Sequence, residues 1–386
     1  MNLLVISNNF PDKNDGYIGD IFVKEQLRAL RKYFDTIYVI SPKPFGIELF
    51  RKAHQEDYNF DNIQVFFPSF LTVPLFYFKY RKIWLLLAKR AVLRKIKEQN
   101  LRFDLIHAHY TWPSGVIGIE LGKIFKVPII VTEHTSRTFE KAIKKRDSLY
   151  AKTWKSCSAI IRVRKGDIKK IVSLGVPEHK IFHIPNGFDS KEFSVLDRSI
   201  ARTKLGLPCK KRIMISIGSL LEVKGHKYLI DAMPGVISQK SDVLCLIVGS
   251  GPLTDKLQKQ IRELGVEDHV KLVGAKSHNE IPLWLNASDL FVLPSLSEGN
   301  PTVMFEALGC GVPFVGTKVG GVPEVITSEE YGLLCEPGNA DDLAEKILIA
   351  LDKKWDREKI RRYAEQFTWD NVTKQVMAVY ESVLNK

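Results

Sequence analysis

The sequence predicts an α/β protein built from two doubly wound parallel sheets in tandem. Short apolar runs rich in β-branched residues alternate with longer amphipathic stretches along almost all of the 386 residues. Such continuously apolar runs are typical of parallel strands covered by helices on both faces. The alternation starts again near residue 210. The chain length also suits two domains better than one.

The elements follow from these patterns in chain order. The first half contains six predicted strands, over residues 3–7, 36–40, 105–108, 129–132, 159–163 and 181–184. The second half contains six more, over residues 212–217, 243–248, 270–272, 290–293, 314–316 and 333–335. Amphipathic stretches predict helices over residues 20–33, 228–237, 255–264, 279–287, 302–310 and 340–351.

A final helix is predicted over residues 369–384. Its apolar residues recur at a spacing that gives one buried face: Val372, Val376, Val379, Tyr380 and Val383. The domain boundary is expected within residues 184–212, where Pro, Asn-Gly and a polar stretch interrupt both periodicities. The predicted domains are therefore 1–190 and 191–365, followed by a C-terminal helical segment, 366–386.

Composition indicates a cytoplasmic protein without a transmembrane segment. The first ten residues lack the basic region of a signal peptide. The longest charge-free run, residues 63–78, contains Pro68 and Pro74 and is shorter than the roughly 20 residues a spanning helix needs. Five cysteines are scattered without close pairs. This distribution fits a reducing compartment and predicts neither a disulfide framework nor a zinc site.

The excess positive charge lies in the first half of the chain. Residues 1–190 contain 32 Lys and Arg against 18 Asp and Glu, a net charge of +14, whereas residues 191–386 contain 25 against 26. Segments 78–100 and 141–170 are especially basic. This asymmetry predicts an anionic partner, with lipid headgroups, a phosphorylated acceptor and nucleic acid as alternatives.

Residues 70–100 combine aromatic and aliphatic side chains with eight basic residues and a single acid. This composition suits a helix that lies on an anionic membrane surface. A basic surface helix with no lipid contact explains the same composition. Both interpretations stay open at this stage.

Loops that follow the strands of the first half contain candidate ligand-binding residues. Gly16 and Gly19 open a helix after the first strand, where backbone N–H groups can approach a phosphate. The pattern is not the dinucleotide fingerprint, so a nicotinamide enzyme is not expected. His107 is predicted to be packed in the core and His109 to be exposed at the strand end. Glu133, with His134 after it, ends the next strand, and no metal site is expected.

The second half repeats the strand–glycine–helix arrangement. Gly218 and Ser219 follow a strand, and Lys224 stands at the entry to the next helix, where a lysine can neutralise a diphosphate. Gly249 and Gly251 follow the next strand in the same way.

The stretch SEGNPTVMFEALGCGVP, residues 297–313, is the most informative. A strand ends, the chain turns, and a helix begins near Thr302. The segment from Asn300 through Pro301 to Val303 can therefore cradle an anion with the free N–H groups of Asn300, Thr302 and Val303. Glu306 lies one helical turn after Thr302, and Glu298 lies on the preceding loop. Carboxylates accept hydrogen bonds from sugar hydroxyls. This combination predicts a ligand with sugars on either side of a diphosphate, which describes a nucleotide sugar.

These motifs resemble those of retaining glycosyltransferases of family 4, which have the GT-B fold. The resemblance covers essentially the whole chain. In the second half it rests on Lys224-Gly225, Val248–Pro252, the two glutamates with seven residues between them, Gly311–Pro313, Gly320–Glu324 and Gly332. In the first half it rests on Gly16 and Gly19, His107–His109 and Pro185–Gly187.

The resemblance implies a role for each candidate residue. Glu306 would hold the ribose hydroxyls and Glu298 the hydroxyls of the transferred sugar. Lys224 and the amides of 300–303 would stabilise the departing diphosphate, the main charge that develops in the transition state. His109 would contact the donor sugar.

The resemblance also implies an architecture and a reaction. Two Rossmann-like domains would face a central cleft, with the acceptor on the N-terminal side, the nucleotide sugar on the C-terminal side and the last helix crossing back to the N-terminal domain. Transfer would retain the anomeric configuration without a metal or cofactor, by a front-face route with no side-chain nucleophile. UDP-sugar and GDP-sugar donors are both compatible. Ser219 departs from the family, since many relatives have an arginine there.

Two other functions remain as alternatives. One is a nucleotide-sugar epimerase of the same fold, which would turn over the donor without an acceptor. The other is a non-catalytic basic protein that binds nucleic acid, although no platform of interleaved aromatic and basic residues supports it. The preferred interpretation is a hexosyl-type transferase that builds a cell-envelope polysaccharide or glycolipid at the inner face of the plasma membrane, with no nucleic-acid partner.

Overall fold

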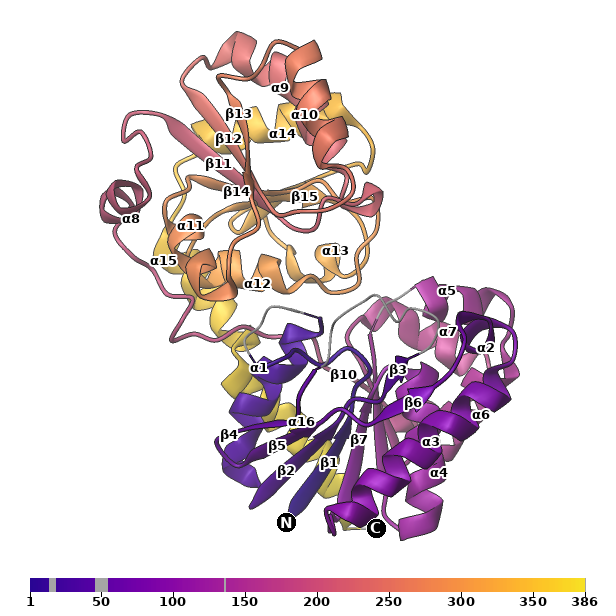
Figure 1. Ribbon diagram of the computed structural model, residues 1–386. Coiled ribbons are helices and arrows are strands. Elements are labelled where there is room, and N and C mark those ends of the chain that lie inside the picture. The colour runs from indigo at the N-terminus through magenta and orange to yellow at the C-terminus, as the bar shows by residue number, and fades with distance from the viewer. Residues whose placement is uncertain (14–18, 46–54, 135–136, 386) are drawn as a thin grey trace. The chain divides into compact units, whose positions relative to one another are not determined.

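The computed structural model describes residues 1–13, 19–45, 55–134 and 137–385, which form two compact units. The N-terminal unit combines Met1–Pro185 with Val372–Lys386, and the C-terminal unit is Asn186–Asn371. Each unit has its own sheet (Figure 1). Among the described residues, no helix is both long and apolar enough to cross a membrane.

The N-terminal unit is built on an eight-stranded sheet with the order β10-β9-β8-β7-β1-β2-β5-β4. Neighbouring strands are parallel except for the antiparallel pair β4 and β5. β3 and β6 form a separate parallel pair. The strands are β1 (Asn2–Ile6), β2 (Thr36–Ile40), β3 (Lys43–Phe45), β4 (Tyr58–Phe60), β5 (Ile63–Phe66), β6 (Ser69–Leu71), β7 (Leu105–His109), β8 (Ile129–Glu133), β9 (Ala159–Arg162) and β10 (Ile181–His183).

Helices cover both faces of this sheet. Ile106 and Ala108 of β7 pack into a core that contains residues of α3, α4, α6 and α7. His107, which points to the opposite face of the same strand, contacts Tyr380 of α16. The helices are α1 (Ile21–Leu30), α2 (Pro74–Phe78), α3 (Arg81–Glu98), α4 (Val116–Phe125), α5 (Arg137–Lys144), α6 (Ser148–Ser156), α7 (Ile168–Val172) and α16 (Trp369–Leu384).

The C-terminal unit contains a six-stranded parallel sheet with the order β13-β12-β11-β14-β15-β16. Figure 1 shows α9, α10 and α14 on one face and α11, α12 and α15 on the other, with a separate apolar core under each set. The strands are β11 (Arg212–Ile217), β12 (Val243–Val248), β13 (Val270–Gly274), β14 (Leu290–Leu293), β15 (Phe314–Thr317) and β16 (Gly332–Cys335). The helices are α8 (Arg198–Leu205), α9 (His226–Gln239), α10 (Thr254–Glu263), α11 (Ile281–Asn286), α12 (Thr302–Gly309), α13 (Val322–Val325), α14 (Ala340–Asp352) and α15 (Arg357–Ala364).

The twelve strands expected from the sequence are all present, within two residues at their ends, and the two doubly wound sheets are confirmed. Strands β3 to β6 were missed because each has only three or four residues, too few to show a period. The predicted domains end at residues 190 and 365, whereas the compact units divide after Pro185 and after Asn371.

The strand order locates the ligand sites that this fold allows. In each sheet the strand order reverses direction next to the unit's first strand, between β1 and β7 and between β11 and β14. Ligands of doubly wound sheets bind beyond the carboxyl ends of the strands at this switch point. In the C-terminal unit, the loops after β11 and β14 therefore border the expected ligand site.

Candidate functional site

Lys224 and Glu298 form an ion pair beside the switch point of the C-terminal sheet. Lys224 precedes α9 on the connection from β11, and Glu298 lies on the loop from β14 to α12. Lys224 Nζ donates to Glu298 Oε1 over 2.7 Å, and Ser295 Oγ donates to the same oxygen over 2.6 Å. The Glu298 side chain is 8% exposed. Two residues that are 74 positions apart are thus brought together, and one carboxylate oxygen takes both hydrogen bonds.

Glu306 has a partner that the sequence did not suggest. It lies on α12 and is buried, and its Oε1 is 3.1 Å from Nε2 of His278. Because a carboxylate can only accept, the imidazole donates from Nε2. The His278 ring also packs 5.4 Å from the ring of Phe193. His278 therefore positions the carboxylate that was predicted to hold ribose hydroxyls.

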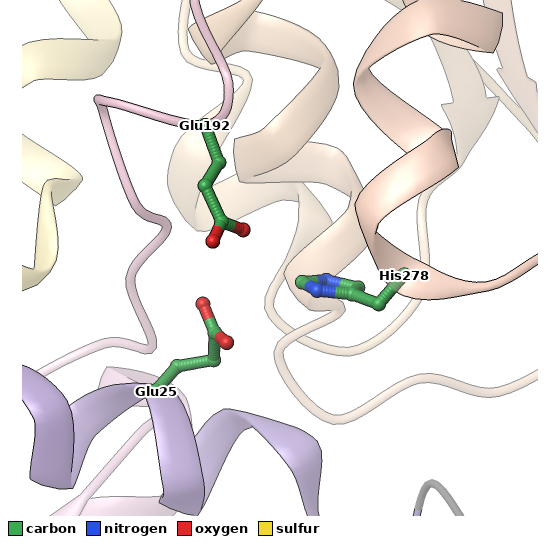
Figure 2. A group of neighbouring side chains, drawn as sticks. All are labelled: Glu25, Glu192 and His278. Carbon is green, nitrogen blue, oxygen red and sulfur yellow. The ribbon is translucent and has the colours of Figure 1, made fainter. Parts of the chain in front are cut away.

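Figure 2 shows the Glu192 carboxylate next to the His278 imidazole, and their ligand atoms lie within 4.8 Å of each other. Glu25, which the figure also draws, belongs to the N-terminal unit. Two ligand atoms alone do not make a metal site. The expectation of a metal-independent enzyme stays a prediction.

Asn300 fixes the loop that leads into α12. Its side-chain Oδ1 accepts from Asn186 N over 2.7 Å, and its carbonyl accepts from Asn186 Nδ2 over 2.8 Å. Both side chains are buried. Pro301 is the N-cap of α12, and no side chain caps the helix. The first N–H groups of the helix, at Thr302 and Val303, have no intrahelical acceptor, so this end suits an anion.

Gly249 and Gly251 must be glycines because two loops approach each other closely at these positions. A Cβ on Gly249 would lie 1.9 Å from the carbonyl oxygen of Gly218, and a Cβ on Gly251 would lie 2.6 Å from that of Leu220. The loops after β11 and β12 thus run against each other. Gly249 also has a φ of +151°. Ser219 lies in the first of these loops, where Gly218 N donates to Val248 O.

Gly320 belongs to a motif of the resemblance but was given no role from the sequence, and His226 was not selected. A Cβ on Gly320 would lie 2.1 Å from the Glu298 carbonyl oxygen, so only glycine lets this loop support Glu298. His226 begins α9 two residues after Lys224 and is buried. Burial, together with the nearby Lys224 charge, lowers the pKa of His226 to about 4. The imidazole is therefore neutral at pH 7 and adds no charge next to Lys224.

In the N-terminal unit, Gly19 is followed by a buried carboxyl group. Gly19 is exposed with a φ of +44°, and Gly16 lies outside the described residues. Asp20 accepts hydrogen bonds from Ser7 Oγ and Tyr110 OH, each over 3.2 Å. Burial raises the pKa of Asp20 to about 7. No sequence pattern singled out Asp20, because acidic residues are common caps at helix starts.

His109 is fully buried, so the prediction that it is exposed was wrong. All five side chains of β7 are buried, because helices cover both faces of this strand. His109 Nδ1 lies 3.1 Å from His134 Nε2, and Nε2 of His109 has no partner among the described residues. His107 is a core residue, as predicted, held by Tyr380 OH and Thr132 Oγ1, both 2.6 Å away.

Glu133 and His134 follow one another in the sequence but have different partners. Glu133 Oε2 accepts from Thr111 N over 2.8 Å and also from the Thr111 hydroxyl. His134 stacks on His109, with ring centroids 5.4 Å apart. Burial raises the pKa of Glu133 to about 7 and lowers that of His134 to about 3. The carboxyl edge of this sheet thus contains several polar groups whose ionisation is controlled by burial.

The chain is similar to known glycosyltransferases over both units. Residues 19–192 match the family model described as Glycosyltransferase Family 4, and residues 197–367 match the one described as Glycosyl transferases group 1. The putative teichuronic acid biosynthesis glycosyltransferase TuaC of Bacillus subtilis is 28% identical over 363 residues, covering 90% of this chain and 88% of the relative. N-acetyl-alpha-D-glucosaminyl L-malate synthase of Bacillus anthracis is 28% identical over 294 residues, with 74% and 76% covered.

Solved structures show the same fold. HepE of Anabaena in complex with UDP superposes with a TM-score of 0.76 at 22% identity and covers 99% of both chains. The same protein in complex with UDP-glucose gives a TM-score of 0.73 at 22% identity, with 99% of this chain and all of that chain covered.

Proposed function

The chain belongs to glycosyltransferase family 4 and has the GT-B fold, and from this we propose that it transfers a hexosyl group from a nucleotide-diphosphate donor to a glycan or lipid-linked acceptor. The supporting observation is the Lys224–Glu298 pair, which lies on the loops at the switch point of the C-terminal sheet. A cation, two carboxylates and a free helix N-terminus on these loops match the phosphates and hydroxyls of one nucleotide sugar.

In this proposal Lys224 exchanges its partner when the donor binds. Without donor it pairs with Glu298 over 2.7 Å, which keeps the lysine in place in a partly buried position. A bound diphosphate offers a stronger anionic partner, and the α12 N-terminus adds N–H donors. Glu298 then keeps only the Ser295 hydrogen bond at Oε1 and can accept from hydroxyls of the transferred sugar. Charge that develops on the leaving phosphate is stabilised by Lys224.

Glu306 would accept hydrogen bonds from the ribose of the donor. His278 donates to Oε1 of Glu306, and no described residue donates to Oε2. Glu306 is buried on α12, so a second hydrogen-bond donor would be strongly favoured. A ribose diol provides such donors.

We propose retention of configuration without a metal, by the front-face route that is expected for this family. The leaving phosphate would take the proton of the acceptor, so that no side chain acts as nucleophile. The name of the TuaC relative refers to teichuronic acid biosynthesis, which supports an acceptor in the cell envelope. The HepE complexes with UDP and UDP-glucose support a nucleotide-sugar donor.

A panel of UDP-, GDP- and ADP-sugars tested by thermal shift would identify the donor. One of them should raise the melting temperature, because a ligand that binds only the folded state stabilises it by mass action. Glu306→Gln should weaken the binding of that donor roughly tenfold or more, because a charged hydrogen-bond acceptor is lost. Glu330→Gln is the control, since its ion pair with Lys359 is exposed. If no nucleotide sugar shifts the melting temperature, the proposed function is wrong.

We also propose that α2 and α3 lie on an anionic membrane. The membrane-facing surface is defined by six exposed apolar side chains: Leu71, Leu75, Phe78, Tyr80, Ile83 and Leu86. Phe78 is 73% exposed, and α2 contains no buried residue. Lys79 and Lys82 are exposed among them. Apolar side chains flanked by lysines suit the boundary between headgroups and acyl chains.

Sedimentation with vesicles containing anionic phospholipid would test this surface. The wild-type protein should cosediment at low salt and be released as salt rises, because screening weakens the attraction. Leu75→Ser with Phe78→Ser should abolish binding, whereas Ile124→Ser, which removes a 51% exposed residue of α4, should not. A wild-type protein that stays in the supernatant at low salt contradicts the membrane proposal without affecting the donor assignment.

A further inference from the structure

A second pocket lies in the C-terminal unit, at the edge of the sheet opposite the proposed donor site. It has a volume of about 380 Å³. Arg212 begins β11, Asp289 precedes β14 and Pro313 precedes β15, so the pocket lies at the amino ends of these strands. The remaining lining residues come from α8, α14, α15 and the segment between the last two: Arg198, Ala350, Leu351, Lys353, Lys354, Trp355 and Arg357.

Positive charge dominates this lining. Five of the ten lining residues are Lys or Arg, and Asp289 is the single acid. Asp289 already accepts from Arg198 and, over 2.6 Å, from Arg202. Lys353 Nζ donates to a backbone carbonyl, that of Glu329. Lys354 has no hydrogen bond or ion pair with any residue in the described part of the chain. Arg212 pairs with Asp242 over 3.2 Å and with Asp352 over 3.5 Å, two acids outside the lining. Lys353, Lys354 and Arg357 are left without a carboxylate partner among the described residues.

Arg357 is held in place but is not neutralised. Its Nε donates to Gly311 O over 3.2 Å, and its Nη2 donates to Cys310 O over 2.9 Å and to Asn286 Oδ1 over 3.3 Å. All three acceptors are uncharged, and within the described ranges no acceptor is assigned to Nη1. A guanidinium fixed along one edge keeps the other edge ready for a bidentate or single anion contact.

Arg198 and Arg357 are close enough to repel each other. Burial lowers the pKa of Arg357, and the charge of Arg198 is the next cause, partly offset by Cys310, Asp289 and Glu358. Arg198 Nε is buried and has no partner among the described residues. Like charges placed this close are costly unless an anion lies between them. Arg198, Arg212 and Arg357 begin or precede three different elements, so a local basic run does not explain why they converge.

We propose that this pocket binds a small phosphorylated anion at a site separate from the donor site. Phosphate fits because guanidinium groups bind its oxygens in pairs, and lysines add point charge. The volume exceeds that of one phosphate group and falls within the range of small-molecule sites. Ala350, Leu351 and Trp355 can contact an uncharged part of the ligand. A second phosphate group, as in pyrophosphate, would use more of the excess charge.

Titration calorimetry with inorganic pyrophosphate would test this site in the full chain. Lys224→Gln removes the cation of the proposed donor site and so weakens pyrophosphate binding there. Pyrophosphate should still bind this variant with a stoichiometry near one. Adding Lys353→Gln and Lys354→Gln should weaken that remaining binding roughly tenfold per charge. Lys271→Gln, an exposed lysine on the edge strand β13, is the matched control and should change nothing.

The outcomes separate this pocket from the donor site. If Lys224→Gln alone abolishes all pyrophosphate binding, the pocket proposal is overturned and the donor site stands. If binding survives in Lys224→Gln but is unchanged by the Lys353 and Lys354 substitutions, the anion lies elsewhere and the pocket proposal also fails. Binding that is lost only on substitution of Lys353 and Lys354 supports the pocket, whether or not a sugar nucleotide binds. Circular dichroism of each variant verifies the fold.

Discussion

Among single residues, Glu133 should make stability depend on pH. Burial raises its pKa from 4.5 to about 7 in the folded protein. The folded state therefore holds its proton more tightly than the unfolded state between these values. The contribution of Glu133 to stability is greatest below pH 4.5, falls as pH rises to about 7, and is constant above that. The total change is at most roughly 3 kcal/mol, at about 1.36 kcal/mol per pKa unit.

Glu133→Gln removes this titration and keeps an oxygen that can accept from Thr111. The melting temperature of the variant, relative to wild type, should therefore increase from pH 5 to pH 8. Glu120→Gln, at a partly exposed ion pair of the same unit, is the control and should show no such trend. A difference that stays constant across this range would mean that Glu133 titrates near its ordinary pKa.

At the level of elements, the loop before α12 depends on the reciprocal pair of Asn186 and Asn300. Each residue uses its side chain on the backbone of the other, and both are buried. Asn186→Ala and Asn300→Ala should each lower the free energy of unfolding by about 1–2 kcal/mol, because each leaves one buried backbone group unpaired. Asn300→Asp keeps the side-chain acceptor and should lower the free energy of unfolding by less. Urea denaturation measures these values, and an equal loss for Asp and Ala at position 300 would contradict this account.

At the level of the whole molecule, the chain returns to its first unit at the end. Val372, Val376 and Tyr380 of α16 are buried, and their contacts belong to the N-terminal unit. Val376→Ala should lower the free energy of unfolding of that unit by roughly 1–2 kcal/mol through lost packing, and its unfolding temperature should fall accordingly. The C-terminal unit should be unaffected, whereas a bound donor should stabilise it. Differential scanning calorimetry with and without the donor would resolve the two effects; a shift of both units by Val376→Ala would show that they unfold together.

Sequence patterns predicted the fold well because each pattern depends on local chemistry. Continuous apolar strands such as β12 are buried on both faces, and glycines mark the points where loops approach each other. The spacing of Glu298 and Glu306 around a helix start was likewise visible in seventeen residues. The predicted roles of Lys224, Glu298 and Glu306 remain predictions that the donor experiments address.

Partners that are distant in the chain could not be found in this way. His278 reaches Glu306 across 28 positions, and Asn186 reaches Asn300 across 114. No local pattern records such a pairing, since it depends on how strands and loops are ordered in space. The prediction that His109 is exposed was wrong for a related reason. A position at a strand end shows which face a side chain points to, but not what covers that face.

The sequence by itself determined the two doubly wound sheets, the family, and the residue types of the proposed nucleotide-sugar site, because these depend on periodicity and on local turns. The tertiary structure alone decided which charges are neutralised. It placed Glu298 against Lys224, left Lys354 without a partner among the described residues, and set Arg357 among neutral oxygens. Charge balance depends on distances between elements, and those distances arise only when the chain has folded.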